Sequence, residues 1–371
     1  MKIVQILPEL NEGGVERGVM ELSRELVKKG FESIVISHGG KLVPLIGHDG
    51  GLHVKLDVCS KNIFTVPWRI FQLYKTLKKI NPNVLHVRSR VPAWIVFFAN
   101  KVLKLPVIST VHGFNSVSSY SAIMTKSLHV ICVSNAIKSY IMQHYAIPEE
   151  KITVIPRGVD LDKFNPKKLN HAFILEFKSQ FNLQDKWLIS AVGRITQLKD
   201  LETFIKAIAI LKEKFPNVVG LIVGGVRKDK QKYFESLKNL VESLHVKENI
   251  CFCGSSDNIT EIYALSDVIV SSSKKPESFG RSVAEAIAMN TPVVATGHGG
   301  VLDIIQEDIH GYFTKIGDAQ DLAEKIIKAK VLKFDGYSYV SENFSLTQMV
   351  EKTISIYQFF SYKSSLDDLR Q

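Results

Sequence analysis

The segment KPESFGRSVAEAIAMNTPVVAT, residues 275–296, carries two glutamates, Glu277 and Glu285, with a predicted turn and the start of a helix between them. Pro276 and Gly280 favour the turn, and the first backbone N–H groups of the following helix lack intrahelical acceptors. Such a helix start binds phosphate, and a carboxylate beside it can accept hydrogen bonds from two neighbouring sugar hydroxyls. We therefore interpret the segment as a site for a diphosphate between two sugars, with Glu285 toward a ribose and Glu277 toward a second sugar.

Two cations follow another apolar run in the second half of the chain. In AVGRITQLKDL, Gly193 ends the run, Arg194 follows it, and Lys199 precedes the next helical pattern. At the carboxyl end of a strand, an arginine can bind a diphosphate through two N–H groups and a lysine can bind it as a point charge. An ordinary solvated loop explains the same pattern, and these residues alone do not decide between the two.

The first half offers two further candidate segments. In PELNEGGVERG, Gly13 and Gly14 predict a turn that opens a helix and lets the backbone approach a ligand, although a plain turn is an equal alternative. In HVRSRVPAW, Arg88 and Arg90 follow an apolar run and are expected at the mouth of a cleft. Arginines there suit the carboxylates or phosphates of an acidic acceptor.

Alternating apolar and amphipathic segments must position all of these residues. Short continuous apolar runs separated by helical patterns predict parallel sheets covered on both faces. The pattern restarts after a polar stretch, so we predict an α/β chain of two doubly wound, Rossmann-like domains, residues 1–165 and 166–346, with a C-terminal helix at 347–371 returning to the first. Ligands of such folds bind at the carboxyl ends of the strands, here in a cleft between the domains.

The whole chain resembles the retaining glycosyltransferases of family 4, which have the GT-B fold of two Rossmann-like domains. Glu277 and Glu285 have the spacing of that family's paired glutamates, and the order of the motifs also matches. The matching segments are EGGVER, STVHGF, VICVSNAIK, VIPRGVDLDKF, AVGRITQLKDLETFIKAIAIL and PESFGRSVAEAIAMNTPVVATGHGG.

The resemblance implies a role for each matching residue. His112, otherwise a core histidine at a strand end, would lie over the donor sugar, and Glu277 would hold that sugar's hydroxyls. Arg194 and Lys199 would clamp the diphosphate. The remaining donor-binding residues would be Gly13, Gly14, Ser278, Phe279, Gly280, Arg281 and Glu285.

Two departures from the family pattern stand out: Arg157-Gly158 replaces a frequent Asn-Gly, and Asp303 replaces a frequent Glu. We expect neither to touch the core motif.

The implied reaction is sugar transfer with retention of configuration from a nucleotide-diphosphate sugar, a co-substrate that needs no separate cofactor. The leaving phosphate itself would take the acceptor's proton. No Asp-x-Asp motif stands at a strand end near the predicted cleft, so cations and a helix start would replace a metal ion. Two alternatives are a nucleotide-sugar 2-epimerase on the same fold and a non-catalytic nucleotide-sugar-binding protein.

Charge suggests where the acceptor binds. The chain has a net charge of +10, and residues 1–165 hold 21 basic against 12 acidic residues. The segment WRIFQLYKTLKKI, residues 68–80, combines an apolar face with basic residues and could rest on an anionic membrane, although an ordinary surface helix explains the same pattern. Its apolar face comprises Ile70, Leu73, Leu77 and Ile80, and its basic residues are Arg69, Lys75, Lys78 and Lys79.

HVRSRVPAW further resembles a segment of bacterial lipopolysaccharide-core transferases, some of them mannosyltransferases. We therefore predict an anionic saccharide or glycolipid acceptor, in the cytoplasm or on the inner face of the cytoplasmic membrane. The start MKIVQILPEL predicts no leader, and no apolar run is long enough to span a bilayer. The basic residues are not interleaved with aromatic residues as in nucleic-acid-binding modules, so nucleic acid is not expected as a partner.

Overall fold

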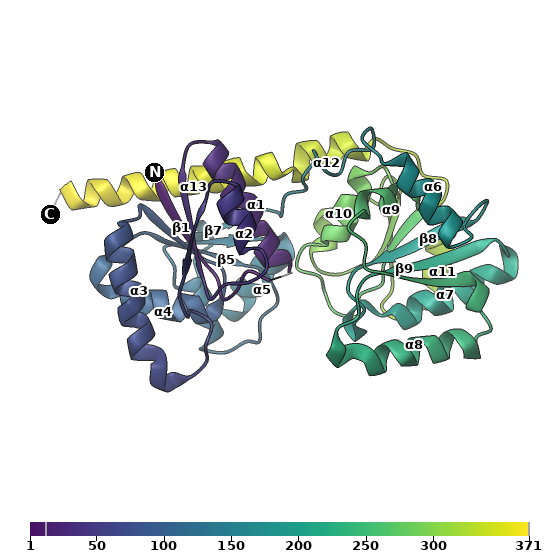
Figure 1. Cartoon of the computed structure of the whole chain (residues 1–371), viewed down its shortest axis with the longest axis horizontal. Coiled ribbons are helices and arrows are strands. Elements are labelled where there is room, and N and C mark those ends of the chain that lie inside the picture. Colours follow the sequence, from purple (N-terminus) through teal and green to yellow (C-terminus); the bar gives the residue numbers. More distant parts are fainter. Residues whose placement is uncertain (12, 370–371) are drawn as a thin grey trace. The chain divides into compact units, whose positions relative to one another are not determined.

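The computed structural model describes the backbone of residues 1–11 and 13–369 and the side chains of residues 1–11 and 13–362. The chain divides into two compact units, Met1–Gly158 together with the helix that begins at Leu346, and Val159–Ser345. The first unit ends before residue 165 because Val159 and Phe164 pack in the core of the second unit. In Figure 1 the strands of each unit lie between helices, as predicted for a doubly wound fold.

The first unit has a parallel sheet with the strand order β3-β2-β1-β4-β5-β6-β7 within the described residues. Its strands are β1 (Lys2–Ile6), β2 (Glu32–Ser37), β3 (Leu52–Lys55), β4 (Val84–Val87), β5 (Val107–Val111), β6 (His129–Cys132) and β7 (Ile152–Val154). Its helices are α1 (Gly14–Lys28), α2 (Val43–His48), α3 (Val66–Ile80), α4 (Arg90–Leu103), α5 (Asn135–His144) and α13 (Leu346–Leu369). The strand order reverses direction between β1 and β4, and ligands of open α/β sheets bind at such a point.

The second unit has a parallel sheet with the order β10-β9-β8-β11-β12-β13 within the described residues. Its strands are β8 (Trp187–Val192), β9 (Val218–Val223), β10 (Ile250–Gly254), β11 (Val268–Ser271), β12 (Val293–Thr296) and β13 (Gly311–Thr314). Its helices are α6 (His171–Gln180), α7 (Leu201–Lys214), α8 (Gln231–Ser243), α9 (Ile259–Leu265), α10 (Arg281–Ala288), α11 (Ala319–Ala329) and α12 (Gly336–Phe344). The direction reverses between β8 and β11, the strands that precede the predicted cations and Glu277.

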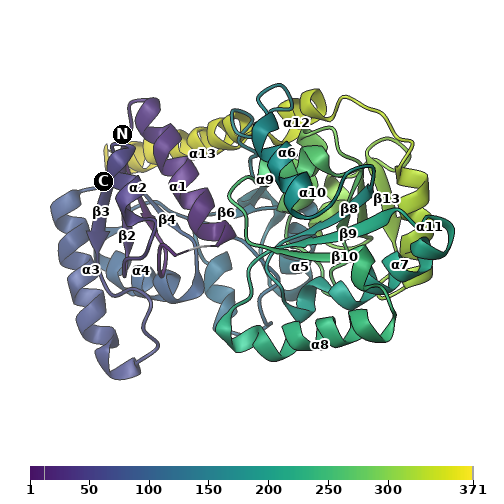
Figure 2. The same ribbon diagram turned by 45° about the vertical axis from the view of Figure 1, so that its right-hand side comes forward.

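The central strands read as unbroken apolar runs because helices cover both faces of each sheet. All residues of β4, β9 and β11 are buried. Helix α13 returns to the first unit and packs Val350, Ile354 and Tyr357 against the first unit's core. Figures 1 and 2 both show this helix running beside α1. The predicted GT-B fold class is therefore confirmed in its two Rossmann-like sheets.

Helix α3 agrees with the alternative of an ordinary surface helix. Leu73 and Leu77, from the apolar face that could have rested on a membrane, are fully buried in the first unit's core. An apolar stripe of helical period can pack against a protein core or a bilayer, and in this structure it packs in the core. No helix in the described part of the chain is both long and apolar enough to cross a membrane.

Candidate active site

Glu277 and Lys199 meet at the reversal point of the second unit's sheet. Lys199 follows β8, Glu277 follows β11, and the lysine Nζ lies 2.5 Å from the glutamate Oε1. The same oxygen accepts hydrogen bonds from the hydroxyls of Ser273, at 2.7 Å, and Ser271, at 3.2 Å. Sequence reasoning placed both charged residues at this edge but missed the serines, although the run Ser271–Ser273 at the end of β11 was visible.

These contacts set the charge state of Glu277. Burial by itself would raise the pKa of its carboxyl group, but the Lys199 ammonium group and the serine hydroxyls outweigh burial and hold the pKa below its usual value. Glu277 is therefore a carboxylate at neutral pH. Its side chain is partly accessible, so one oxygen is held by the protein while the group can still accept hydrogen bonds from a ligand.

The loop after β8 is built to hold Lys199 in this place. Gly193 adopts a positive φ of 142°, and an added Cβ there would press on the Lys199 side chain at 3.3 Å. The hydroxyl of Ser272 donates to the carbonyl oxygens of Lys199 and Asp200. Asp200 is fully buried and forms an ion pair of 2.9 Å with Lys274. The two loops that carry Lys199 and Glu277 are thus tied together by backbone and side-chain contacts.

Arg194, the second predicted cation, lies in the same loop but has a different environment. Its side chain is exposed, and it makes no hydrogen bond or ion pair with any residue that the structure describes. Lys199 is therefore held by contacts within the protein. The N–H groups of the Arg194 guanidinium group point to solvent, where they can bind an anion.

The predicted helix start follows Glu277 directly. Gly280 precedes α10 with a positive φ of 104°, and no side chain caps the helix. Gly299 and Gly300 let a neighbouring loop pass close to Glu277–Phe279, where an added Cβ would collide with the backbone. The N–H group of Val283 donates to the carbonyl oxygen of Gly280 at 3.0 Å. A helix start without a side-chain cap suits an anionic ligand. Phe279 is buried and anchors this turn in the core, and Ser278 and Arg281 are partly buried.

Glu285 already has protein partners in this structure. Its Oε2 accepts a hydrogen bond of 2.9 Å from the hydroxyl of Tyr263, and its Oε1 lies 3.2 Å from Nε of Arg281. Tyr263 is fully buried and was not foreseen from the sequence. The carboxylate of Glu285 is therefore oriented by two neighbours, and a ribose would have to share its oxygens with them.

A pocket of about 290 Å³ marks the reversal point of the first unit's sheet. Its lining includes Glu16, Arg88, Arg90, Thr110 and His112, from the ends of β4 and β5 and the start of α1. The structure therefore brings His112 and both predicted acceptor arginines around one cavity.

Arg88 lies deeper than predicted. It is 9% exposed, and its guanidinium group donates to Gln5 Oε1 at 2.5 Å and to Thr110 Oγ1 at 3.3 Å. Its Nε is buried and has no partner among the described residues. Arg90 is more accessible and donates to Ser121 Oγ at 3.0 Å. Arg88 thus forms part of the pocket's buried wall, and only Arg90 is placed near its opening.

His112 has one ring nitrogen with a protein partner and one without. Nδ1 lies 3.2 Å from Nη2 of Arg157, while Nε2 is buried without a partner among the described residues. Burial lowers the pKa of His112 well below its usual value, and the nearby Arg157, Arg88 and His86 lower it further. The imidazole is therefore neutral at physiological pH.

Arg157, one of the two departures from the family pattern, contacts two other candidate residues of the first unit. Its Nη1 donates a hydrogen bond to the carbonyl oxygen of Gly14, and its Nη2 lies 3.2 Å from Nδ1 of His112. Glu16 folds back over Gly13, and an added Cβ at Gly14 would lie 3.2 Å from Arg157. Gly13 and Gly14 are therefore both approached by side chains of this chain, although Gly14 is exposed.

A second pocket of the first unit, of about 690 Å³, adjoins the first one through Pro8, Ser89 and Arg90. Its walls come from α3, α4 and the segment before α3. They include Ile63, Trp94, Phe98 and Tyr120, and the rings of Trp94 and Tyr120 are stacked with centroids 6.3 Å apart. This pocket combines an apolar lining with one accessible arginine.

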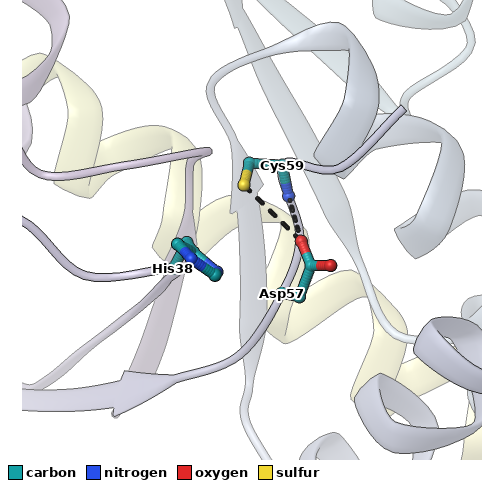
Figure 3. Close-up of side chains that lie close together, drawn as sticks. All are labelled: His38, Asp57 and Cys59. Atoms are coloured by element: carbon teal, nitrogen blue, oxygen red, sulfur yellow. Dashed lines mark hydrogen bonds between the residues drawn. The ribbon is translucent and has the colours of Figure 1, made fainter. Parts of the chain in front are cut away.

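His38, Asp57 and Cys59 form the one group with metal-ligand chemistry found among the described residues, and their ligand atoms lie within 4.8 Å of one another (Figure 3). Asp57 Oδ1 already accepts hydrogen bonds from the backbone N–H groups of Cys59 and Ser60, and burial together with Asp57 raises the pKa of the Cys59 thiol to about 11. The contacts of Asp57 close a turn and account for its position without an ion.

The buried histidines make the stability of the first unit depend on pH. Burial lowers the pKa of both His86 and His112 well below the usual value, whereas in the unfolded chain both protonate at about pH 6.5. Below that pH the unfolded state binds more protons, so the free energy of unfolding falls by up to about 1.4 kcal/mol per pH unit for each histidine. Urea unfolding at about pH 7.5 and about pH 5.5 measures this loss.

The variant His112→Asn should lose part of that pH dependence. His48→Asn, which changes an exposed histidine of the same unit, should keep all of it. Equal pH dependence in all three proteins would contradict a neutral, buried His112.

The comparisons with known proteins agree with these features. The chain matches the family model for group 1 glycosyl transferases at residues 173–335 and that for glycosyltransferase family 4 at residues 12–163. A crystal structure of a glycosyltransferase from Rickettsia africae is 32% identical, with a TM-score of 0.89, and the match covers 97% of this chain and 98% of that one.

Two more distant relatives are also similar. The Anabaena protein HepE, solved in complex with UDP, is 19% identical with a TM-score of 0.85, over 96% of this chain and 99% of that one. Spore coat protein SA of Bacillus subtilis is 25% identical over 76% of this chain and 80% of its own length. With the fold, the paired glutamates and these matches, the chain belongs to the family 4 glycosyltransferases of the GT-B fold, enzymes that use nucleotide-sugar donors.

Proposed function

We propose that this enzyme transfers a hexose, with retention of configuration and without a metal ion, from a nucleoside-diphosphate sugar to a saccharide acceptor. The observation that carries the proposal is the contact between Lys199 and Glu277 at the reversal point of the second sheet, beside the uncapped start of α10. A cation, a carboxylate and an uncapped helix start at one sheet edge match the diphosphate and the hydroxyls of such a donor.

Each residue has a proposed task in donor binding. Lys199 and Arg194 bind the diphosphate, together with the backbone of Ser278, Phe279, Gly280 and Arg281 at the start of α10. Glu277 accepts hydrogen bonds from the transferred sugar, and Glu285 accepts them from the ribose. In the first unit, Gly13 and Gly14 approach the diphosphate, and the free Nε2–H of His112 donates to a hydroxyl of the transferred sugar.

The proposed reaction needs no enzymatic nucleophile. The bond between the sugar's anomeric carbon and the diphosphate oxygen breaks, and a new bond to the acceptor oxygen forms on the same face. The acceptor's proton passes to the leaving phosphate oxygen. Lys199, Arg194 and the N–H groups of α10 stabilise the negative charge that develops on the diphosphate, which is the work that a metal ion performs in other transferases.

Calorimetric titration with UDP, GDP and ADP, and with their hexose derivatives, tests the donor proposal. One nucleoside diphosphate should bind, and at about a hundred times its Kd it should stabilise the folded protein by about 2.7 kcal/mol. Excess EDTA should change affinity and turnover by no more than about twofold, because protein cations neutralise the diphosphate. Loss of turnover in EDTA that magnesium or manganese restores would contradict the metal-independent mechanism.

The epimerase alternative predicts a different outcome. Incubation with donor alone should then yield an epimeric nucleotide sugar, whereas the proposed transferase leaves the donor's sugar configuration unchanged. A protein that binds donor without turning it over in the presence of any saccharide or glycolipid acceptor would instead be a non-catalytic binding protein.

For the acceptor we propose an anionic glycan carried by a lipid, such as lipopolysaccharide core, at the inner face of the cytoplasmic membrane. Arg90, at the opening of the smaller pocket, and the buried Arg88 would bind its acidic groups. The larger, aromatic pocket beside them suits the apolar part of such a molecule.

The surface that would contact the membrane differs from the one predicted. We call it the apolar rim: the exposed side chains Ile63, Phe64, Trp68 and Phe71. Phe64 is 89% exposed and Trp68 is 61% exposed. The exposed Lys61 and Lys75 lie on the same segment, and they can attract anionic lipid. Arg69 is buried and donates to the backbone oxygens of Ser60 and Asn62, so it holds the rim's shape and does not face lipid.

Changing Phe64 and Trp68 together to Ser should weaken binding to vesicles that contain anionic lipid by about tenfold or more, because each exposed aromatic side chain gains roughly 1.5–3 kcal/mol on burial. Phe359→Ser is the matched control, since that side chain is 62% exposed on α13 of the same unit. Co-sedimentation at low and high salt measures the effect. Equal losses in both variants, or no binding by the wild type, would contradict the apolar rim as a membrane contact.

A further inference from the structure

Arg157 joins two parts of the first unit's pocket that lie far apart in the sequence. It follows β7, and its guanidinium group donates through Nη1 to the carbonyl oxygen of Gly14 and through Nη2 to Nδ1 of His112. A planar guanidinium group holds such donors in a fixed fork, which the single ammonium group of a lysine does not. One side chain thus sets the position of the imidazole relative to the start of α1.

The contact also decides which nitrogen of His112 carries the proton. An arginine donates hydrogen bonds but accepts none, so Nδ1 must be the acceptor. In a neutral imidazole the proton is then on Nε2, the nitrogen that is buried without a partner among the described residues. His112 lines the 290 Å³ pocket, so the donor belongs to a residue of the pocket wall.

We propose that Arg157 is a positioning residue that fixes His112 as the Nε2–H tautomer and directs this N–H group to a hydroxyl of the transferred sugar. The inference rests on the proposed function only in naming the sugar as the group that accepts this hydrogen bond. The tautomer itself follows from the contact between Arg157 and His112. The frequent Asn of the family at this position has a shorter side chain and no guanidinium group, so it cannot form this fork.

A competing role for Arg157 is direct binding of the donor diphosphate. Its guanidinium group lies next to Gly14, where the diphosphate is expected, and a cation there could contact phosphate. The two roles predict a different dependence on His112. Loss of a positioning residue should lower activity only when the imidazole is present, whereas loss of a phosphate ligand should lower activity with or without it.

The tautomer is measured directly by two-dimensional NMR that correlates the imidazole carbon-bound protons with both ring nitrogens of ¹⁵N-histidine-labelled protein. His112→Gln identifies the signal. In the wild type at neutral pH, Nδ1 should show the shift of an unprotonated nitrogen and Nε2 that of a protonated one. In Arg157→Met the two nitrogens should move toward an average of both tautomers, and Arg157→Lys should give an intermediate result. A wild-type His112 with its proton on Nδ1 would overturn the proposal, whether or not the enzyme transfers sugar.

A double-mutant cycle separates the positioning role from phosphate binding. Arg157→Met should lower kcat/KM by about tenfold when it is introduced into the wild-type protein. Introduced into His112→Ala, it should lower kcat/KM by less than about twofold, because the effects of substituting two residues that act through one another are not additive. Calorimetry with the nucleoside diphosphate alone should show unchanged affinity in Arg157→Met. An equal loss in both backgrounds, together with weaker nucleoside diphosphate binding, would identify Arg157 as a phosphate ligand and overturn the positioning role. Failure of all turnover with an intact tautomer would count against the proposed function alone.

Discussion

Replacing Lys199 by Met lowers kcat/KM for sugar transfer by about a hundredfold to a thousandfold, the loss typical of removing one group that stabilises developing charge in a closed site. The same change weakens binding of the nucleoside diphosphate by about tenfold to a hundredfold, because a charge-assisted hydrogen bond contributes roughly 1.5–3 kcal/mol. It also removes the ammonium group that lies 2.5 Å from Glu277. Only the hydroxyls of Ser271 and Ser273 then oppose the effect of burial on the carboxyl group, so the pKa of Glu277 should rise.

The sign of the accompanying pH effect follows from that pKa. A glutamate whose pKa is depressed in the folded state adds stability above its unfolded pKa, and this stability is lost as the pH falls through the folded pKa. In Lys199→Met the loss should begin at a higher pH than in the wild type. Lys206→Met, an exposed lysine on α7, is the control and should change neither kinetics nor stability. Wild-type affinity for nucleoside diphosphate in Lys199→Met would remove Lys199 from the proposed diphosphate site.

Replacing Glu277 by Gln should separate recognition of the transferred sugar from binding of the diphosphate. The amide keeps the side chain's shape but loses the charge, so hydroxyls of the transferred sugar lose a charged acceptor and kcat/KM should fall by about a hundredfold. Lys199 loses its anionic partner in this variant, keeps only a neutral acceptor and becomes freer to bind phosphate. Binding of the nucleoside diphosphate should therefore stay equal or become tighter, in contrast to Lys199→Met.

Titration of both variants with the nucleoside diphosphate and with the complete donor measures this contrast. The control is Glu202→Gln, an acidic residue at the start of α7 that accepts a hydrogen bond from Tyr233 outside the contact between Lys199 and Glu277. If Glu277→Gln weakened binding of the nucleoside diphosphate as much as binding of the donor, Glu277 would support the diphosphate site and would not recognise the sugar.

The sequence predicted the fold and the location of the candidate groups well, for a physical reason. Strands that are covered on both faces lack the alternation of half-exposed strands, so apolar runs between helical patterns indicate a parallel sheet. The carboxyl ends of such strands meet at one edge, which places Lys199 after β8 and Glu277 after β11 near each other. Their direct contact joins positions 78 residues apart and could not be read from spacing.

The misread features share another cause. The apolar stripe of α3 has the same period whether it faces a core or a bilayer, and the exposed Phe64 and Trp68 lie on the segment before it and at its start. Arg88 was expected at the mouth of a cleft because it follows an apolar run, but Gln5 and Thr110 accept its hydrogen bonds in the interior. The contact of Arg157 with His112 joins two loops, and no local pattern encodes it.

The most direct test of the central claim follows the anomeric proton of the donor's sugar by ¹H NMR during turnover, with the donor that binds in the titrations and a glycan acceptor. The wild type should release the nucleoside diphosphate and give a product whose anomeric configuration equals that of the donor, in the presence of EDTA, and Lys199→Met should slow this reaction by about a hundredfold or more. A product with inverted configuration, or turnover that is equal in Lys199→Met, would contradict a retaining mechanism built on Lys199 and Glu277.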